Sequence, residues 1–165
     1  MKRTSLTRKT PLQARSGLRR TPAETCRTRP RRPHRRATAT GPSQTVRLLV
    51  KARAEGRCER CATRVLSLDD QARTWPVYPY SIHHRIPRGM GGTSRPELNQ
   101  PGNLVLLCGT GVDGCHGWIE SHRHAAAEAG WLLPTSTADP TTVPVVLWHG
   151  RPVYLLNDGT PKEKK

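Results

Sequence analysis

Residues 82–92 read IHHRIPRGMGG, residues 103–108 read NLVLLC and residues 115–118 read CHGW. The three runs hold two adjacent histidines, an asparagine ahead of an apolar run, and a third histidine that directly follows a cysteine. A neutral imidazole accepts a proton near neutral pH, because its ordinary pKa is about 6.5, and it is also a common metal ligand. These runs therefore carry residue types that serve proton transfer and metal binding.

The pattern around these runs predicts a strand, a long loop, a second strand and a helix, in that order. The expected ranges are 81–86 for the first strand, 88–102 for the loop, 104–107 for the second strand and 115–129 for the helix. Pro87 stops the first strand because it lacks the N–H that a ladder requires. Adjacent residues on a regular strand face opposite ways, so His83 and His84 serve one site only if the strand ends or bends there.

Four cysteines form two pairs that favour a structural zinc. Cys58 and Cys61 make a C-x2-C pair, and Cys108 and Cys115 make a wider pair with three glycines between them. Four thiolates suit a tetrahedral Zn²⁺, and glycines allow the wider loop to fold back. Ordinary free thiols, one disulfide, and His116 as the fourth zinc ligand are the alternatives. Cys26 stands apart and is interpreted as incidental.

The charge of the chain points to a polyanionic partner. Its 165 residues carry 28 Lys+Arg against 12 Asp+Glu, a net charge of +16, which argues against most cytosolic metabolic enzymes and favours nucleic acid. Residues 1–36 alone hold 13 basic residues and one acidic residue. This proline-rich segment predicts a disordered basic arm over 1–42 that clamps phosphates or serves only as a solubilising leader. The arginines expected to contact nucleic acid there are Arg19, Arg20, Arg31 and Arg32.

The remaining segments complete an α+β domain over 43–133 and an extension over 134–165. Ser43 predicts the cap of a helix that ends at Gly56, and a strand is expected over 65–68 before an irregular segment over 69–80. The extension predicts a hairpin from 143–148 and 153–156 with a frayed tail. With 34% hydrophobic residues and no Phe, the core is expected to be thin and to need a metal or disulfide staple. No secretory signal or membrane span is expected, which predicts a cytoplasmic protein without a membrane partner.

The order and spacing of these motifs resemble the HNH endonuclease family, and most closely the phage HNH nucleases with cysteine pairs flanking the motif. The resemblance covers about residues 56–133 and implies a ββα-metal core buttressed by a structural zinc. It makes His83 and His116 metal ligands, His84 the general base and Asn103 the residue that orients the loop. Glu120, one turn beyond His116, and His122 are both candidates for the third ligand. Arg85 and Arg88 are expected to hold flanking phosphates.

The resemblance implies a metal-dependent DNA endonuclease that leaves 5′-phosphate and 3′-hydroxyl ends. It implies a divalent catalytic metal (Mg²⁺, Mn²⁺, Ni²⁺ or Zn²⁺), DNA as partner, and a setting in the cytoplasm of a phage host, in genome packaging with terminase proteins or in mobility. The main alternative is a non-catalytic zinc-containing DNA-binding or packaging accessory protein. A basic RNA-binding protein of ribosomal type is a further alternative, and the histidine pair is then a phosphate-binding patch.

Overall fold

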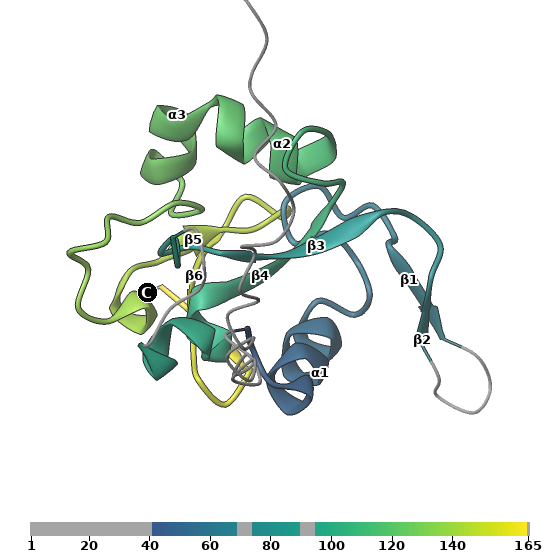
Figure 1. Cartoon of the computed structure of the whole chain (residues 1–165), viewed down its shortest axis with the longest axis horizontal. Helices are drawn as coiled ribbons and strands as arrows, with labels where there is room; N and C mark the ends of the chain where they lie inside the picture. Colours follow the sequence, from purple (N-terminus) through teal and green to yellow (C-terminus); the bar gives the residue numbers. More distant parts are fainter. Residues whose placement is uncertain (1–40, 69–73, 90–94, 165) are drawn as a thin grey trace, which may run out of the picture. The chain divides into compact units, whose positions relative to one another are not determined.

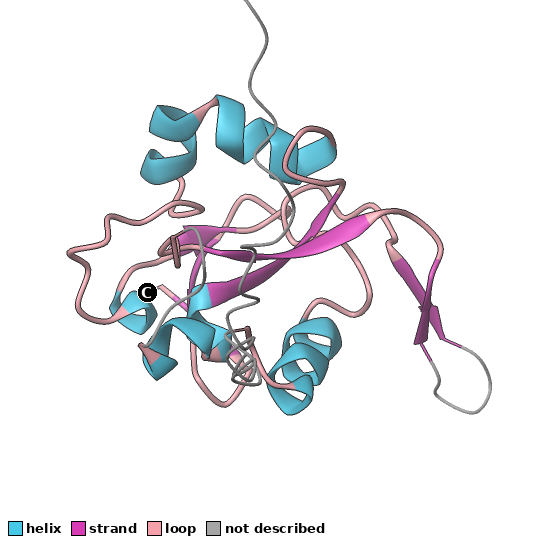
Figure 2. Ribbon diagram, viewed as in Figure 1, coloured by secondary structure: helices cyan, strands magenta, loops and turns pink. Residues whose placement is uncertain are grey.

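The computed structural model describes residues 41–68, 74–89 and 95–164, which belong to one compact unit. In chain order its elements are α1 (Gln44–Arg53), β1 (Leu66–Leu68), β2 (Thr74–Pro76), β3 (Tyr80–His84), η2 (Pro96–Asn99), η3 (Pro101–Asn103), β4 (Leu104–Cys108), α2 (Gly114–Ser121), α3 (Arg123–Glu128), η4 (Pro140–Thr142), β5 (Val145–Val146), β6 (Pro152–Leu155) and β7 (Pro161–Glu163). Figure 2 shows that loops and turns join these short helices and strands. The chain is therefore a small mixed helix and strand fold.

The basic arm falls almost wholly outside this description. Residues 1–40, with Arg19, Arg20, Arg31 and Arg32, are not among the described residues. The disorder and the phosphate clamp proposed for the arm therefore stay predictions.

The centre of the fold is an antiparallel pair, β3 and β4, with a helix on either side. The pairing register joins Tyr80 to Cys108 and His84 to Leu104. Figure 1 shows α2 over one side of this pair and α1 over the other, and both helices pack against β4. Because helices cover it on both sides, every residue of β4 is buried. The order strand, loop, strand, helix is confirmed, although β3 ends at His84, two residues before the predicted end.

The cap of α1 follows the prediction, whereas the helix ends at Arg53, three residues before Gly56. The Ser43 Oγ accepts a hydrogen bond from the backbone N–H of Val46 at 3.3 Å, which satisfies one of the free donors of the first turn. Beyond Arg53 the chain turns through Gly56, whose φ is +68°. A side chain at Gly56 would be strained, and its Cβ would lie 3.0 Å from the Leu66 carbonyl oxygen.

Three predicted elements differ from the structure. The helix expected over 115–129 is broken at His122, where φ is −118° and ψ is 52°. The Ser121 hydroxyl donates to the carbonyls of Gly117 and Trp118, a local bond that competes with the helical ladder. The segment expected to be irregular contains β2, which pairs with β1, and the tail expected to fray contains β7, which pairs with β6.

One buried cluster joins the hairpin, the helices and the C-terminal strands. It includes the apolar residues of β4, Val50 of α1, Ile119 of α2, and Val145, Val153 and Leu155 of the C-terminal strands. The extension over 134–165 therefore packs into the same core as the central hairpin. None of the helices in the described part of the chain has the length and apolar character that crossing a membrane requires.

Candidate functional site

The four paired cysteines come together at one end of the central hairpin. Cys58 and Cys61 lie in a tight turn after α1, where the Cys58 N–H donates to the Thr63 carbonyl at 2.8 Å. Cys108 ends β4, and Cys115 lies in the first turn of α2. The four Sγ atoms lie within 4.8 Å of one another, and all four cysteines are free thiols. The prediction that the two pairs meet is confirmed.

The wide spacing of the second pair depends on two glycines. Gly109 and Gly114 have φ values of +81° and +61°, a region that side chains rarely adopt. A Cβ on Gly114 would also lie 2.7 Å from the Cys108 carbonyl oxygen. The loop closes on itself here because neither position carries a side chain.

The chemistry of these sulfurs fits a metal ion. Cys61 Sγ and Cys108 Sγ are 3.6 Å apart, close to the roughly 3.8 Å between thiolates bound at about 2.3 Å to a tetrahedral zinc. The Cys115 sulfur and burial raise the pKa of the Cys58 thiol, and burial raises that of Cys108. Proton loss from such thiols needs a cation beside them, which a bound metal supplies. The cluster is positioned to hold one metal ion and is compatible with a structural zinc.

Arg60 lies between Cys58 and Cys61 in the sequence, and its side chain contacts α2. Its guanidinium lies 3.7 Å from the centre of the Trp118 ring, and its Nη1 donates to the Cys115 Sγ at 3.5 Å. A cation in this position offsets the negative charge that four thiolates carry around a divalent metal.

A second ligand cluster lies between β3 and α2. It consists of His83, His116 and Glu120. Each residue offers one ligand atom, and these three atoms lie within 4.8 Å of one another. His116 and Glu120 are one helical turn apart, with His116 Nε2 3.9 Å from Glu120 Oε1, and the His83 and His116 rings meet edge to face at 5.0 Å between centroids. His122 is not in the cluster; its exposed ring stacks on Trp118. Of the two candidates for a third ligand, the structure places Glu120 beside the histidines.

Burial lowers the pKa of both histidines of this cluster, so both rings are neutral at pH 7, and each has a nitrogen suited to a metal. Burial, with the nearby His116 charge, lowers the pKa of His83 to about 4. The His83 Nε2 lies 3.3 Å from the Trp131 carbonyl oxygen, which can only accept, so its hydrogen is on Nε2 and Nδ1 keeps a lone pair. Within residues 41–68, 74–89 and 95–164, His116 Nδ1 is the one buried side-chain nitrogen or oxygen without a hydrogen-bond partner. Two histidines and a carboxylate in this state fit a divalent cation.

His84 lies on a different side of β3. It lines a cleft between α1 and β3, and its Nε2 is 3.0 Å from the Asn99 Oδ1. Burial lowers the pKa of His84, so the ring is neutral at pH 7. The structure brings His83, His116 and Glu120 together and does not place His84 among them, as the alternation of a strand requires.

Asn103 is fully buried and holds both ends of the loop between β3 and β4. Its Oδ1 accepts from the Ile86 N–H at 2.8 Å, and its Nδ2 donates to the carbonyls of Leu98 at 2.9 Å and Ile86 at 3.3 Å. These are the bonds that a loop-orienting side chain needs, and the functional role stays a prediction.

The prediction that Arg85 contacts DNA is wrong. Arg85 is fully buried, and its guanidinium donates to the backbone carbonyls of Gly102, Gly130, Pro140, Val143 and Pro144. Burial lowers its pKa to about 10, and five carbonyls take up its donors. Arg85 therefore joins the loops around the hairpin and offers no surface to a phosphate. Arg88, by contrast, is exposed and lines the same cleft as His84.

Sequence reasoning missed a buried ion pair and a set of cleft residues. Arg53 donates to both carboxylate oxygens of Glu59, at 2.8 and 3.0 Å, and Glu59 accepts the Leu106 N–H at 2.7 Å. This pair ties α1 and the first cysteine turn to β4. Arg47 and Lys51 line the cleft beside His84; their four-residue spacing on a predicted helix was the available signal.

Comparison with protein-family models, with curated proteins and with solved structures finds no match.

Proposed function

We propose that this chain is a metal-dependent endonuclease of the HNH type that cuts DNA and leaves 5′-phosphate and 3′-hydroxyl ends. The observation that carries the proposal is the cluster of His83, His116 and Glu120 between an antiparallel strand pair and the helix that follows it. A protein that only binds DNA has no need for neutral histidines and a carboxylate in this arrangement. A separate structural zinc is proposed to be held by the four cysteines, Cys58, Cys61, Cys108 and Cys115.

The proposed chemistry divides between the two sides of β3. His83, His116 and Glu120 would hold a divalent cation, which when bound supplies positive charge for a phosphate oxygen and for the leaving 3′-oxygen. His84 is the last residue of β3 and directly follows His83, so a phosphate bound at this end of the strand would lie within reach of both the metal ligands and the His84 ring. Because His84 is neutral at pH 7, its free nitrogen can accept the proton of the attacking water. Asn103 keeps the loop after His84 in place through its bonds to Ile86 and Leu98. Arg88, beside His84, can contact a flanking phosphate.

The proposal is tested with supercoiled plasmid and the purified full chain. We expect nicked or linear product with at least one of Mg²⁺, Mn²⁺ and Ni²⁺, and none when EDTA is added with the substrate. The product ends are checked by ligation, which requires a 5′-phosphate. No cleavage with any of these metals, combined with tight DNA binding, would favour the non-catalytic DNA-binding alternative.

A further inference from the structure

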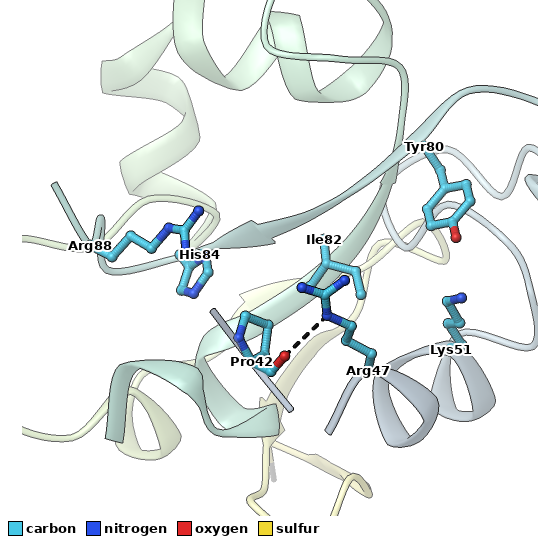
Figure 3. A pocket seen from close by; sticks show the side chains of 7 residues that line it. All are labelled: Pro42, Arg47, Lys51, Tyr80, Ile82, His84 and Arg88. Atoms are coloured by element: carbon cyan, nitrogen blue, oxygen red, sulfur yellow. Dashed lines mark hydrogen bonds between the residues drawn. The ribbon is translucent and has the colours of Figure 1, made fainter. Parts of the chain in front are cut away.

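The cleft between α1 and β3 is rich in positive charge. It has a volume of about 310 Å³, and Figure 3 shows the side chains around it. The described residues that line it include Arg47, Lys51 and Arg88 and no carboxylate. Cations gathered in a hollow without acids create a local positive potential that attracts anions.

The sequence brings these side chains together from two regular elements. Arg47 and Lys51 are four residues apart and share one face of α1. Tyr80, Ile82 and His84 alternate along β3 and share one face of that strand, which Figure 3 shows turned toward α1. Lys51 Nζ lies 5.3 Å from the centre of the Tyr80 ring, so the two elements meet at this end of the cleft.

Two guanidinium groups converge at the other end of the cleft. Arg47 Nη2 and Arg88 Nη1 each lie 3.5 Å from the position that a Cβ on Gly41 would take. The Arg47 Nε donates to the Pro42 carbonyl at 3.1 Å, which orients its guanidinium (Figure 3). The two nitrogens are therefore no more than about 7 Å apart. Guanidinium groups bind phosphate oxygens in pairs of parallel hydrogen bonds, so two of them at this separation can bind the same phosphate.

We propose that this cleft binds the backbone phosphates of a nucleic-acid strand. Arg47 and Arg88 hold one phosphate beside His84, and Lys51 holds another toward Tyr80. The β3 segment along the cleft, from Tyr80 to His84, rises about 13 Å, which is longer than a single phosphate group. The choice of a nucleic-acid strand as ligand rests on the proposed nuclease function, and it leads that strand directly to His84.

The test measures binding of a short fluorescent DNA duplex by anisotropy over a salt series, without added divalent metal. Arg47→Glu combined with Lys51→Glu should weaken binding at low salt by at least about tenfold and lower the log–log salt slope by about 0.9 for each phosphate that the cleft no longer neutralises. The matched control combines Lys162→Glu with Lys164→Glu, which changes the net charge equally on exposed residues outside the cleft. We expect the control pair to change the affinity by less than about twofold.

A second pair of variants leaves every cation in place. Gly41→Asp puts a carboxylate between the two guanidiniums and should weaken duplex binding, whereas Gly41→Ala should not, because its Cβ makes only ordinary contacts. Circular dichroism and metal content confirm that each variant folds.

The proposal is overturned if the control pair weakens binding as much as the cleft pair, or if neither does. It is also overturned if the cleft pair no longer binds inorganic phosphate but keeps the duplex affinity of the wild type, since the cleft is then a site for small anions alone. Binding is measured without cleavage, so a protein that never cuts plasmid but shows the cleft effect contradicts the nuclease proposal alone.

Discussion

At the scale of single residues, the protonation of the histidines decides what each can do. His83 and His84 are both neutral because burial disfavours the charged ring, yet they face different neighbours. The His83 Nε2–H donates to the Trp131 carbonyl, whereas His84 lies beside Asn99 and the cations of the cleft. Neighbours along the chain therefore serve different roles, one as a proposed ligand and the other as the proposed base.

The role of His84 is tested by removing its ring. His84→Ala should lower the rate of plasmid cleavage by about 10²–10⁴-fold, the usual contribution of a positioned general base, while DNA binding and zinc content stay the same. His124→Ala is the matched control, since His124 is an exposed histidine on α3. Cleavage by His84→Ala at nearly the wild-type rate would show that another group takes the proton.

Asn103 allows a second test at this scale, on stability. Asn103→Ala removes three buried hydrogen bonds and leaves the Ile86 N–H without a partner. We expect a loss of about 2–4 kcal/mol in the free energy of unfolding, from urea denaturation with metal present. Asn157→Ala is the control: its exposed side chain accepts one bond, from the Gly102 N–H, and its loss should cost about 1 kcal/mol or less. Equal losses in the two variants would contradict the importance of the Asn103 hydrogen bonds.

At the scale of elements, the two ligand clusters are linked through α2. Cys115 and His116 are adjacent in the first turn of this helix. A metal bound to the four cysteines therefore also fixes the position of His116. The buried ion pair of Arg53 and Glu59 also joins α1 to the turn that contains Cys58 and Cys61. The sulfur cluster therefore positions the helix on which two of the three proposed catalytic ligands lie.

Loss of one thiol should act on both clusters. A structural zinc contributes about 10–16 kcal/mol of apparent folding free energy, which this small core cannot replace. Cys58→Ser should contain less than stoichiometric zinc by elemental analysis, show reduced helicity by circular dichroism and lose cleavage. Cys26→Ser should keep all three properties, because Cys26 is predicted to lie outside the zinc site. Wild-type protein purified without chelator and free of zinc would contradict this account.

Local signals in the sequence predicted much of this architecture. Ser43 capping α1, the glycines between Cys108 and Cys115, and the one-turn spacing of His116 and Glu120 act over a few residues, so they can be read from spacing alone. Arg85 could not be placed in the same way, because the five carbonyls around it come from segments 17 to 59 residues away. The Trp131 carbonyl beside His83 could not be placed for the same reason, because the two residues are 48 positions apart in the sequence.

At the scale of the whole molecule, charge is concentrated in the segment that precedes the fold. Residues 1–36 carry 13 basic residues and one acidic residue, and the rest of the chain is only weakly basic. Such a segment attracts DNA through phosphates with little regard to sequence. The proposed catalytic residues all lie after position 80, so binding by the arm and cleavage should be separable.

Removal of residues 1–40 tests this separation. Affinity for duplex DNA should fall at low salt, and the log–log salt slope should decrease by about 0.9 for each phosphate that the arm had neutralised. The rate at saturating substrate and the zinc content should change little, since Ser43 and all later elements remain. Affinity measured over a salt series provides the comparison, and an unchanged slope would favour the arm as a solubilising leader.

The most direct test of the account is a calorimetric titration of Mn²⁺ into the zinc-loaded protein. The proposed metal centre predicts one Mn²⁺ site that disappears in His116→Ala, weakens in Glu120→Gln and is retained in His122→Ala, whose ring stacks on Trp118 outside the cluster. Wild-type Mn²⁺ binding in His116→Ala would contradict the central claim that His83, His116 and Glu120 form a metal centre.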